Sequence, residues 1–257
     1  MRDNSERMVM RVIGNAGVGA LPKHPTMTRP VDEAAGTQWR LLYRIGAWVG
    51  VLAILLIPVS LVVFMVWPPP ETVSGHFARL QENLWLGLLG IDLIYLIANV
   101  LLVPMLLALY MALRRDNESL MLLAITLVLV GTVALVAANP LVEMWTLSNQ
   151  YAAATTAAER TLYLTAGEAF LVGYTGTAYH AHYILGSIGL LLMAVVMVRS
   201  PRFGRFAAYT GMAANLVAFG LYVPVIGVTL SAISGIAYLV WFLLIIRKLF
   251  QLAAGDG

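Results

Sequence analysis

The sequence lacks cysteine and holds few charged residues. Of 257 residues none is cysteine, 11% are charged and 60% are hydrophobic. Without cysteine the chain cannot form disulfides, thiolate metal sites or iron–sulfur clusters. The scarcity of charge and a mean hydropathy of +0.83 exclude a soluble domain, because about a quarter of the residues in such a domain are charged. We therefore expect an integral membrane protein in contact with the lipid bilayer.

A large excess of one charge is also absent. The formal net charge is +3, and the basic residues stand at the ends of apolar runs rather than along one face. This arrangement is typical of membrane topology and not of a nucleic-acid surface. We expect no nucleic-acid partner, and the sequence identifies no protein partner.

The start of the chain lacks any long apolar run. Residues 1–38 are charged, rich in small residues and interrupted by proline. This composition predicts a disordered cytoplasmic tail without a signal peptide, so the first membrane helix acts as the targeting signal. Residues 39–252 are expected to form a transmembrane domain, and residues 253–257 a second, short cytoplasmic tail.

Charge-free runs predict six membrane-spanning helices, since one crossing needs about 20 apolar residues. The last two share one uncharged run, which Pro224 and Gly227 divide into a hairpin. The predicted spans are Leu41–Trp67, Leu84–Leu113, Ser119–Ala138, Thr177–Val198, Phe206–Tyr222 and Thr229–Ile246.

Basic residues predict the orientation of these spans. They gather at alternate helix ends, whereas the opposite loops carry only Arg79 and Arg160. By the positive-inside rule both termini are cytoplasmic, in a multi-pass protein of the bacterial inner membrane. The residues on the predicted inner side are Arg40, Arg44, Arg114, Arg115, Arg199, Arg202, Arg205, Arg247 and Lys248.

The loop before the fourth span is not a simple connection. Apolar residues such as Leu162, Leu164 and Phe170 alternate there with Glu159, Arg160 and other polar residues. This pattern predicts an amphipathic helix that lies on the outer leaflet or dips into it. The predicted fold class is thus all-α: a polytopic six-transmembrane-helix bundle with an extra amphipathic helix on the outer side.

Polar side chains that could carry chemistry gather at one depth. Counting about 1.5 Å per residue from the inner arginines places them near the outer boundary of a hydrocarbon core about 30 Å thick. This candidate outer polar cluster consists of Asp92, Tyr95, Asn99, Asn139, Glu143, Glu168, His180 and His182.

Asp92 is the only carboxylate inside a predicted span, and Tyr95 and Asn99 share its helical face. An ionisable group inside a membrane faces the bundle interior and suggests a functional site. Two interpretations remain open. Asp92 either is an interfacial residue hydrogen-bonded to a neighbouring helix, or forms an ion, proton or substrate site.

The motif His180-Ala181-His182 resembles a ligand pair, but its spacing argues against one. Residues i and i+2 of a helix point about 200° apart, so two such rings cannot bind one metal. An extended start of the fourth span would allow both rings to lie on one side. We predict interfacial packing and expect no metal, haem or other cofactor.

From Ala158 onward the sequence resembles the bacterial membrane proteins grouped as domain of unknown function 4386. The resemblance is carried by Gly167-Glu168-Ala169, by Gly176-Thr177-Ala178 followed by a histidine, and by "YILGSI", "MVRSPRFGR", "AFGLYVP" and the terminal "RKLFQL". It extends more weakly to residue 41, and implies a six-helix bacterial inner-membrane protein. It implies no activity, cofactor or catalytic residue, and His182 stands where similar sequences are expected to carry a small residue.

These patterns favour a non-enzymatic structural, accessory or stress-related membrane protein, although they leave enzymatic activity open. Two alternatives remain. One is a membrane-embedded hydrolase or metal site at the outer leaflet, suggested by Asp, Glu and His at a common depth. The other is a small-solute or ion carrier, suggested by Asp92, Tyr95 and Asn99 on one face and Pro104 in the same helix.

Overall fold

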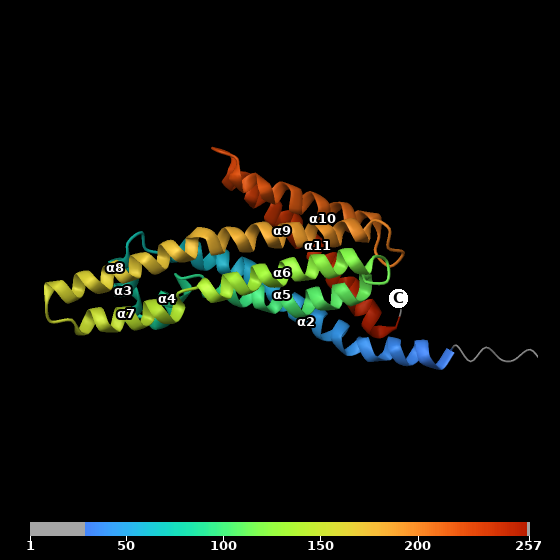
Figure 1. The fold of residues 1–257 in the computed structure, drawn as a ribbon, viewed down its shortest axis with the longest axis horizontal. Helices are drawn as coiled ribbons and strands as arrows, with labels where there is room; N and C mark the ends of the chain where they lie inside the picture. The colour runs from blue at the N-terminus through green and yellow to red at the C-terminus, as the bar shows by residue number, and fades with distance from the viewer. Residues whose placement is uncertain (1–28, 256–257) are drawn as a thin grey trace, which may run out of the picture. The chain divides into compact units, whose positions relative to one another are not determined.

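The computed structural model describes residues 29–255, with side chains from residue 38 onward except that of Val228. The chain divides into two units, Met1–Gly36 and Thr37–Gly257, and apart from the start of the first helix the description below concerns the second. Within the described range every regular element is helical (Figure 1). The elements are α2 (Arg29–Val66), α3 (Val73–Glu82), α4 (Leu84–Leu89), α5 (Leu93–Leu113), α6 (Glu118–Ala138), α7 (Leu141–Ala153), α8 (Ala157–Gly173), η1 (Tyr174–Ala178), α9 (Tyr179–Met197), α10 (Arg205–Ala218), η2 (Phe219–Tyr222) and α11 (Gly227–Ala254).

Five segments of the described chain are long and apolar enough to cross a membrane. This confirms an all-helical, multi-pass membrane protein. The sixth predicted span, Phe206–Tyr222, forms α10, which has 14 residues, and the short 3₁₀ helix η2. The five segments are Gln38–Val66, Leu93–Leu113, Glu118–Ala153, Ala157–Met197 and Thr229–Ala254.

The predicted second span is divided in the structure. Where we expect one helix over Leu84–Leu113, α4 ends at Leu89 and α5 begins at Leu93. Asp92 lies between them in the left-handed conformation, with φ 61° and ψ 28°. Asp is one of the few residues other than glycine that tolerate this conformation. The chain therefore leaves the helical path between Leu89 and Leu93, where the apolar pattern alone would continue one helix.

The first helix begins earlier than predicted. α2 starts at Arg29, so the end of the predicted tail is helical, while residues 1–28 lie outside the described residues. At the other terminus α11 continues to Ala254, beyond the predicted end at Ile246.

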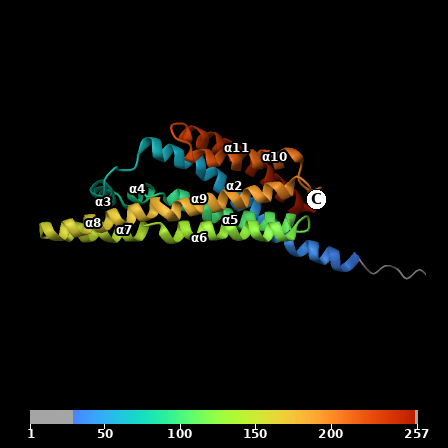
Figure 2. The same cartoon turned by 45° about the horizontal axis from the view of Figure 1, so that its top comes forward.

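Close helix packing depends on glycine at particular contacts. α6 and α9 lie side by side (Figure 2), and Gly189 of α9 faces the carbonyl of Ala124. A Cβ atom on Gly189 would come within 2.6 Å of that oxygen. On α2, Gly50 packs against the side chains of Met105 on α5 and Ile246 on α11. Small residues thus allow the helices to approach where lipid provides no hydrophobic driving force.

A second, smaller group of helices packs at one end of the bundle. We call α3, α7 and α8 the cap, and the opposite end, with Arg114, Arg199 and Arg247, the basic end (Figure 1). α7 continues α6 beyond Pro140, and α8 leads through η1 into α9, so one antiparallel pair builds both bundle and cap. Where a single amphipathic helix is predicted, the structure has the two cap helices α7 and α8. The apolar core at this end of the bundle consists of Val73, Phe77 and Leu80 of α3, Ile91 of the α4–α5 turn and Met144 of α7.

The α6–α9 contact predicts a large difference between two identical substitutions. Gly189→Ala should destabilise the fold by about 1–3 kcal/mol, because the new methyl group meets a backbone oxygen that cannot move aside. Gly186→Ala, one turn earlier on α9, meets nothing within 4 Å and should be neutral or stabilising. Thermal unfolding in detergent measures both, and equal midpoints for the two variants would contradict the packing described.

Candidate functional site

Three helices break at the same level, where the bundle meets the cap. Counted from the basic end, α5 and α6 each run for 21 residues and α9 for 19 before the break. At about 1.5 Å per residue, each covers roughly 30 Å, which is the thickness of a bilayer's hydrocarbon core. The breaks occur at Asp92, at Asn139–Pro140 and in η1, and we call this level the break layer.

The break before α9 is a π-helical turn. η1 covers Tyr174–Ala178, and inside it Gly176 has φ −85° and ψ −133°, outside the helical region. Such turns leave backbone groups without their regular helical partners and are frequent at functional sites. Here the turn places the ring of Tyr174, which is buried, against the start of α5.

Hydrogen bonds join the three breaks. The hydroxyl of Tyr174 donates to Oδ2 of Asp92 over 3.0 Å. The amide Nδ2 of Asn139 donates to the carbonyl of Ile91 over 3.4 Å, and its Oδ1 accepts from the N–H of Leu141 over 3.3 Å. Each break is thus bonded, directly or through its neighbour, to the turn around Asp92. The layer fixes how the cap joins the bundle.

One helical turn towards the basic end, a second polar pair connects α5 to α9. The hydroxyl of Tyr95 and Nε2 of His182 lie 3.2 Å apart, with the rings nearly perpendicular. His182 is 9% exposed, and its Nδ1 makes no hydrogen bond in the described structure. Asn99 donates to the carbonyl of Tyr95 over 2.9 Å, and this bond lies within α5 and connects it to no other helix.

The two histidines of the His-Ala-His motif have separate partners. α9 is helical from Tyr179, so the predicted divergence of the rings is confirmed. His182 points to α5, whereas His180 is exposed and its Nδ1 lies 3.1 Å from the hydroxyl of Tyr222. The pair cannot bind a common metal ion.

The predicted outer polar cluster is only partly brought together. Asp92, Tyr95, Asn139 and His182 meet in or beside the break layer, but Glu143 and Glu168 are exposed on the cap. Among the described residues no group of three or more His, Cys, Asp or Glu side chains could hold a metal ion. The shared feature is therefore hydrogen bonding between helices rather than convergence on one point.

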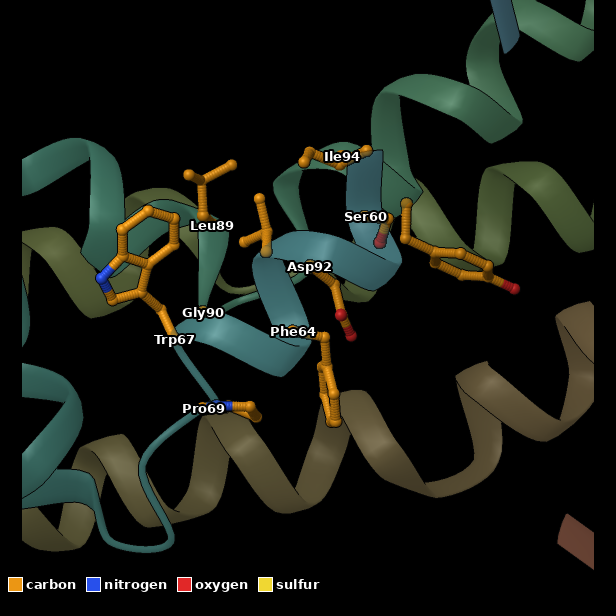
Figure 3. A pocket seen from close by; sticks show the side chains of 10 residues that line it. Ser60, Phe64, Trp67, Pro69, Leu89, Gly90, Asp92 and Ile94 are labelled. Atoms are coloured by element: carbon orange, nitrogen blue, oxygen red, sulfur yellow. The ribbon is translucent and has the colours of Figure 1, made fainter. Parts of the chain in front are cut away.

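A small pocket lies beside Asp92, between the end of α2 and the α4–α5 turn (Figure 3). The cavity volume open to the centre of a water molecule is 20 Å³. This is enough for about one water. It ends at Tyr95 and does not reach Asn99. Its lining residues are Ser60, Val63, Phe64, Trp67, Pro69, Leu89, Gly90, Asp92, Ile94 and Tyr95.

Sequence reasoning missed a polar network between α10 and α11. The hydroxyl of Tyr238 on α11 donates to Oδ1 of Asn215 on α10 over 2.6 Å, and Ser234 donates to the carbonyl of Ala214 over 2.9 Å. Trp241 is fully buried beside them against Gly211. The available signal was Asn215, the only amide side chain in its apolar run. Tyr174 gave no such signal, because nothing local marks it as a partner of Asp92.

Two ionisable groups of the cap have altered pKa values. Burial, and then the nearby Arg79, lower the pKa of His76 below its ordinary value of 6.5, which keeps the ring neutral inside the cap. The backbone N–H groups of Thr156 and Thr155 lower the pKa of Glu159, which caps α8 together with the Thr156 side chain. The bonds of Glu159 thus fix the start of α8.

Comparison with known proteins adds no family to this description. The chain matches no family model, no curated protein and no solved structure. The functional argument consequently rests on the geometry of the break layer and the cap.

The bond between Tyr174 and Asp92 predicts a specific loss of stability. Tyr174→Phe removes a hydroxyl that donates to a carboxylate, and such a bond contributes about 1.5–3 kcal/mol. The free energy of unfolding in detergent should fall by that amount. Tyr209→Phe serves as the control, since Tyr209 is 57% exposed on α10. If both variants unfold at the wild-type midpoint, the bond does not hold the layer together.

Proposed function

We propose that this chain is a non-enzymatic membrane protein with a structural, accessory or stress-related role, whose cap forms an interaction surface outside the bilayer. The main support for this proposal is that the spanning helices α6 and α9 continue beyond the break layer as an ordered hairpin. We place the protein in the bacterial inner membrane, as the resemblance to domain of unknown function 4386 implies.

The proposed topology has six spans. The 14 residues of α10 and the four of η2 together extend about 29 Å at the rises of α- and 3₁₀-helices. That length suffices for a sixth crossing. With six spans both termini lie at the basic end, and the positive-inside rule puts this end in the cytoplasm. The cap is then on the outer side.

The lengths of the paired helices support a cap outside the membrane. The segments Glu118–Ala153 and Ala157–Met197 have 36 and 41 residues, or roughly 54 and 62 Å at the helical rise. A hydrocarbon core of about 30 Å covers only their bundle portions. The remaining lengths, α7 and α8, project beyond it.

The polar residues support a role without catalysis. The hydrogen bonds of Tyr174 and Asn139 hold the breaks together, and the bond of Tyr95 joins α5 to α9, so these groups are engaged in contacts between helices. The pocket beside Asp92 has room for about one water, which does not favour a carrier path. The cap meanwhile exposes apolar side chains, with Val142 66% and Leu162 63% exposed, as an interaction surface would.

A complementation experiment tests the role of the cap surface separately from that of the polar residues. In a strain whose deletion phenotype is restored by the wild-type chain, Leu162→Glu should abolish restoration because a charge interrupts the apolar surface. Thr161→Glu, which adds the same charge to a neighbouring exposed position, should restore it. His180→Ala should also restore it.

Membrane abundance and the unfolding midpoint of each variant are measured in parallel, so that loss of folding is not mistaken for loss of function. Loss of restoration by His180→Ala at normal abundance, with full restoration by Leu162→Glu, would contradict the proposal and favour a chemical role for the polar residues.

A further inference from the structure

The pocket beside Asp92 combines one carboxylate with apolar walls. α2 contributes Val63, Phe64 and Trp67, and the α4–α5 segment contributes Leu89 and Ile94 (Figure 3). Phe64 and Trp67 are themselves well exposed, at 58% and 46%. The pocket is thus continuous with the surface that the spanning helices present to lipid.

Only one of the two carboxylate oxygens of Asp92 accepts a hydrogen bond from the described part of the protein. Oδ2 accepts the bond from Tyr174, and no other hydrogen bond to this side chain occurs in the described part of the chain. Among described residues no Lys or Arg lies close enough to act on it. The residue is exposed at the pocket. A carboxylate next to apolar surface is costly unless a cation or donor pairs with it.

The depth of the pocket indicates what supplies that cation. It lies at the break layer, about 30 Å from the basic end, which is the level of lipid headgroups in the proposed topology. A molecule there has its charged group near Asp92 and its acyl chains along the exposed faces of α2 and α5. A zwitterionic phospholipid fits both parts.

The size of the pocket selects the kind of ammonium group. Space for about one water admits a primary ammonium, which is close to water in size and can donate up to three hydrogen bonds. A trimethylammonium group is larger and has no N–H to donate. Ser60 also lines the pocket and carries a hydroxyl group, whereas the hydroxyl of Tyr95 is engaged with His182.

We propose that this pocket binds the primary ammonium headgroup of an outer-leaflet phospholipid such as phosphatidylethanolamine, with Asp92 as the acceptor. This inference rests on the proposed membrane placement of the break layer. It goes beyond the proposed function, because it assigns a lipid ligand to a site that is separate from the cap surface.

The first test needs no variant. Full-length protein is reconstituted in nanodiscs of equal phosphatidylethanolamine and phosphatidylcholine with identical acyl chains, and retained lipid is identified by native mass spectrometry. The most tightly held lipid should be enriched about tenfold in phosphatidylethanolamine, the ratio that one charge-assisted hydrogen bond provides. Equal retention of the two lipids would overturn the proposal.

Variants then locate the site. Asp92→Asn should remove the enrichment, whereas Glu143→Gln, which neutralises an exposed carboxylate of the cap, should keep it. Enrichment that persists in Asp92→Asn would overturn the assignment to this pocket. If Asp92→Asn does not fold, the wild-type lipid comparison still decides the proposal.

A last arm distinguishes the lipid from a soluble amine. Protein in pure phosphatidylcholine nanodiscs is titrated with ethanolamine hydrochloride, and its unfolding midpoint is followed. No rise at millimolar ethanolamine supports the lipid as the source, whereas a saturable rise equal to that in phosphatidylethanolamine would overturn it. Failure of the cap variants in complementation leaves these lipid measurements unaffected, so the two proposals can fail separately.

Discussion

A helix that enters lipid must keep every backbone N–H and C=O group bonded, and this constraint governs where the helices of this protein break. α5, α6 and α9 each continue without interruption for 19 to 21 residues and then break. A left-handed residue, an extended asparagine followed by proline, and a π-helical turn all disturb the backbone bonding pattern. All three occur where a bilayer of ordinary thickness would end.

The hydrogen bonds of the break layer follow from the same constraint. Tyr174 and Asn139 reach from two breaks to the third, so the turn at Asp92 is held from both sides. This arrangement makes a rigid junction between bundle and cap, and it leaves one carboxylate oxygen of Asp92 facing the pocket. The proposed cap surface and the proposed headgroup site are therefore two consequences of one junction.

The sequence predicts those parts of the fold that single residues determine. The charges around Glu118 and Arg199 mark the ends of α6 and α9 to within two residues of their observed bounds. The division at Asp92 could not be predicted, because the apolar pattern runs through it and Tyr174, its partner, lies 82 residues away in the chain. The bond between Tyr238 and Asn215 escaped prediction for the same reason: pairing between helices is not encoded locally.

The account's central claim is that the three breaks lie at one depth, at the outer edge of the hydrocarbon core. Because the chain has no cysteine, single spin labels at Leu93→Cys, Ala137→Cys and Thr177→Cys can report depth by power saturation in lipid, with Val130→Cys as a mid-bundle reference. We expect the three break positions to agree within about one helical turn, roughly 5 Å, near the headgroups. The reference should lie well inside the bilayer. Break positions at clearly different depths, or any of them at the depth of Val130, would contradict the account.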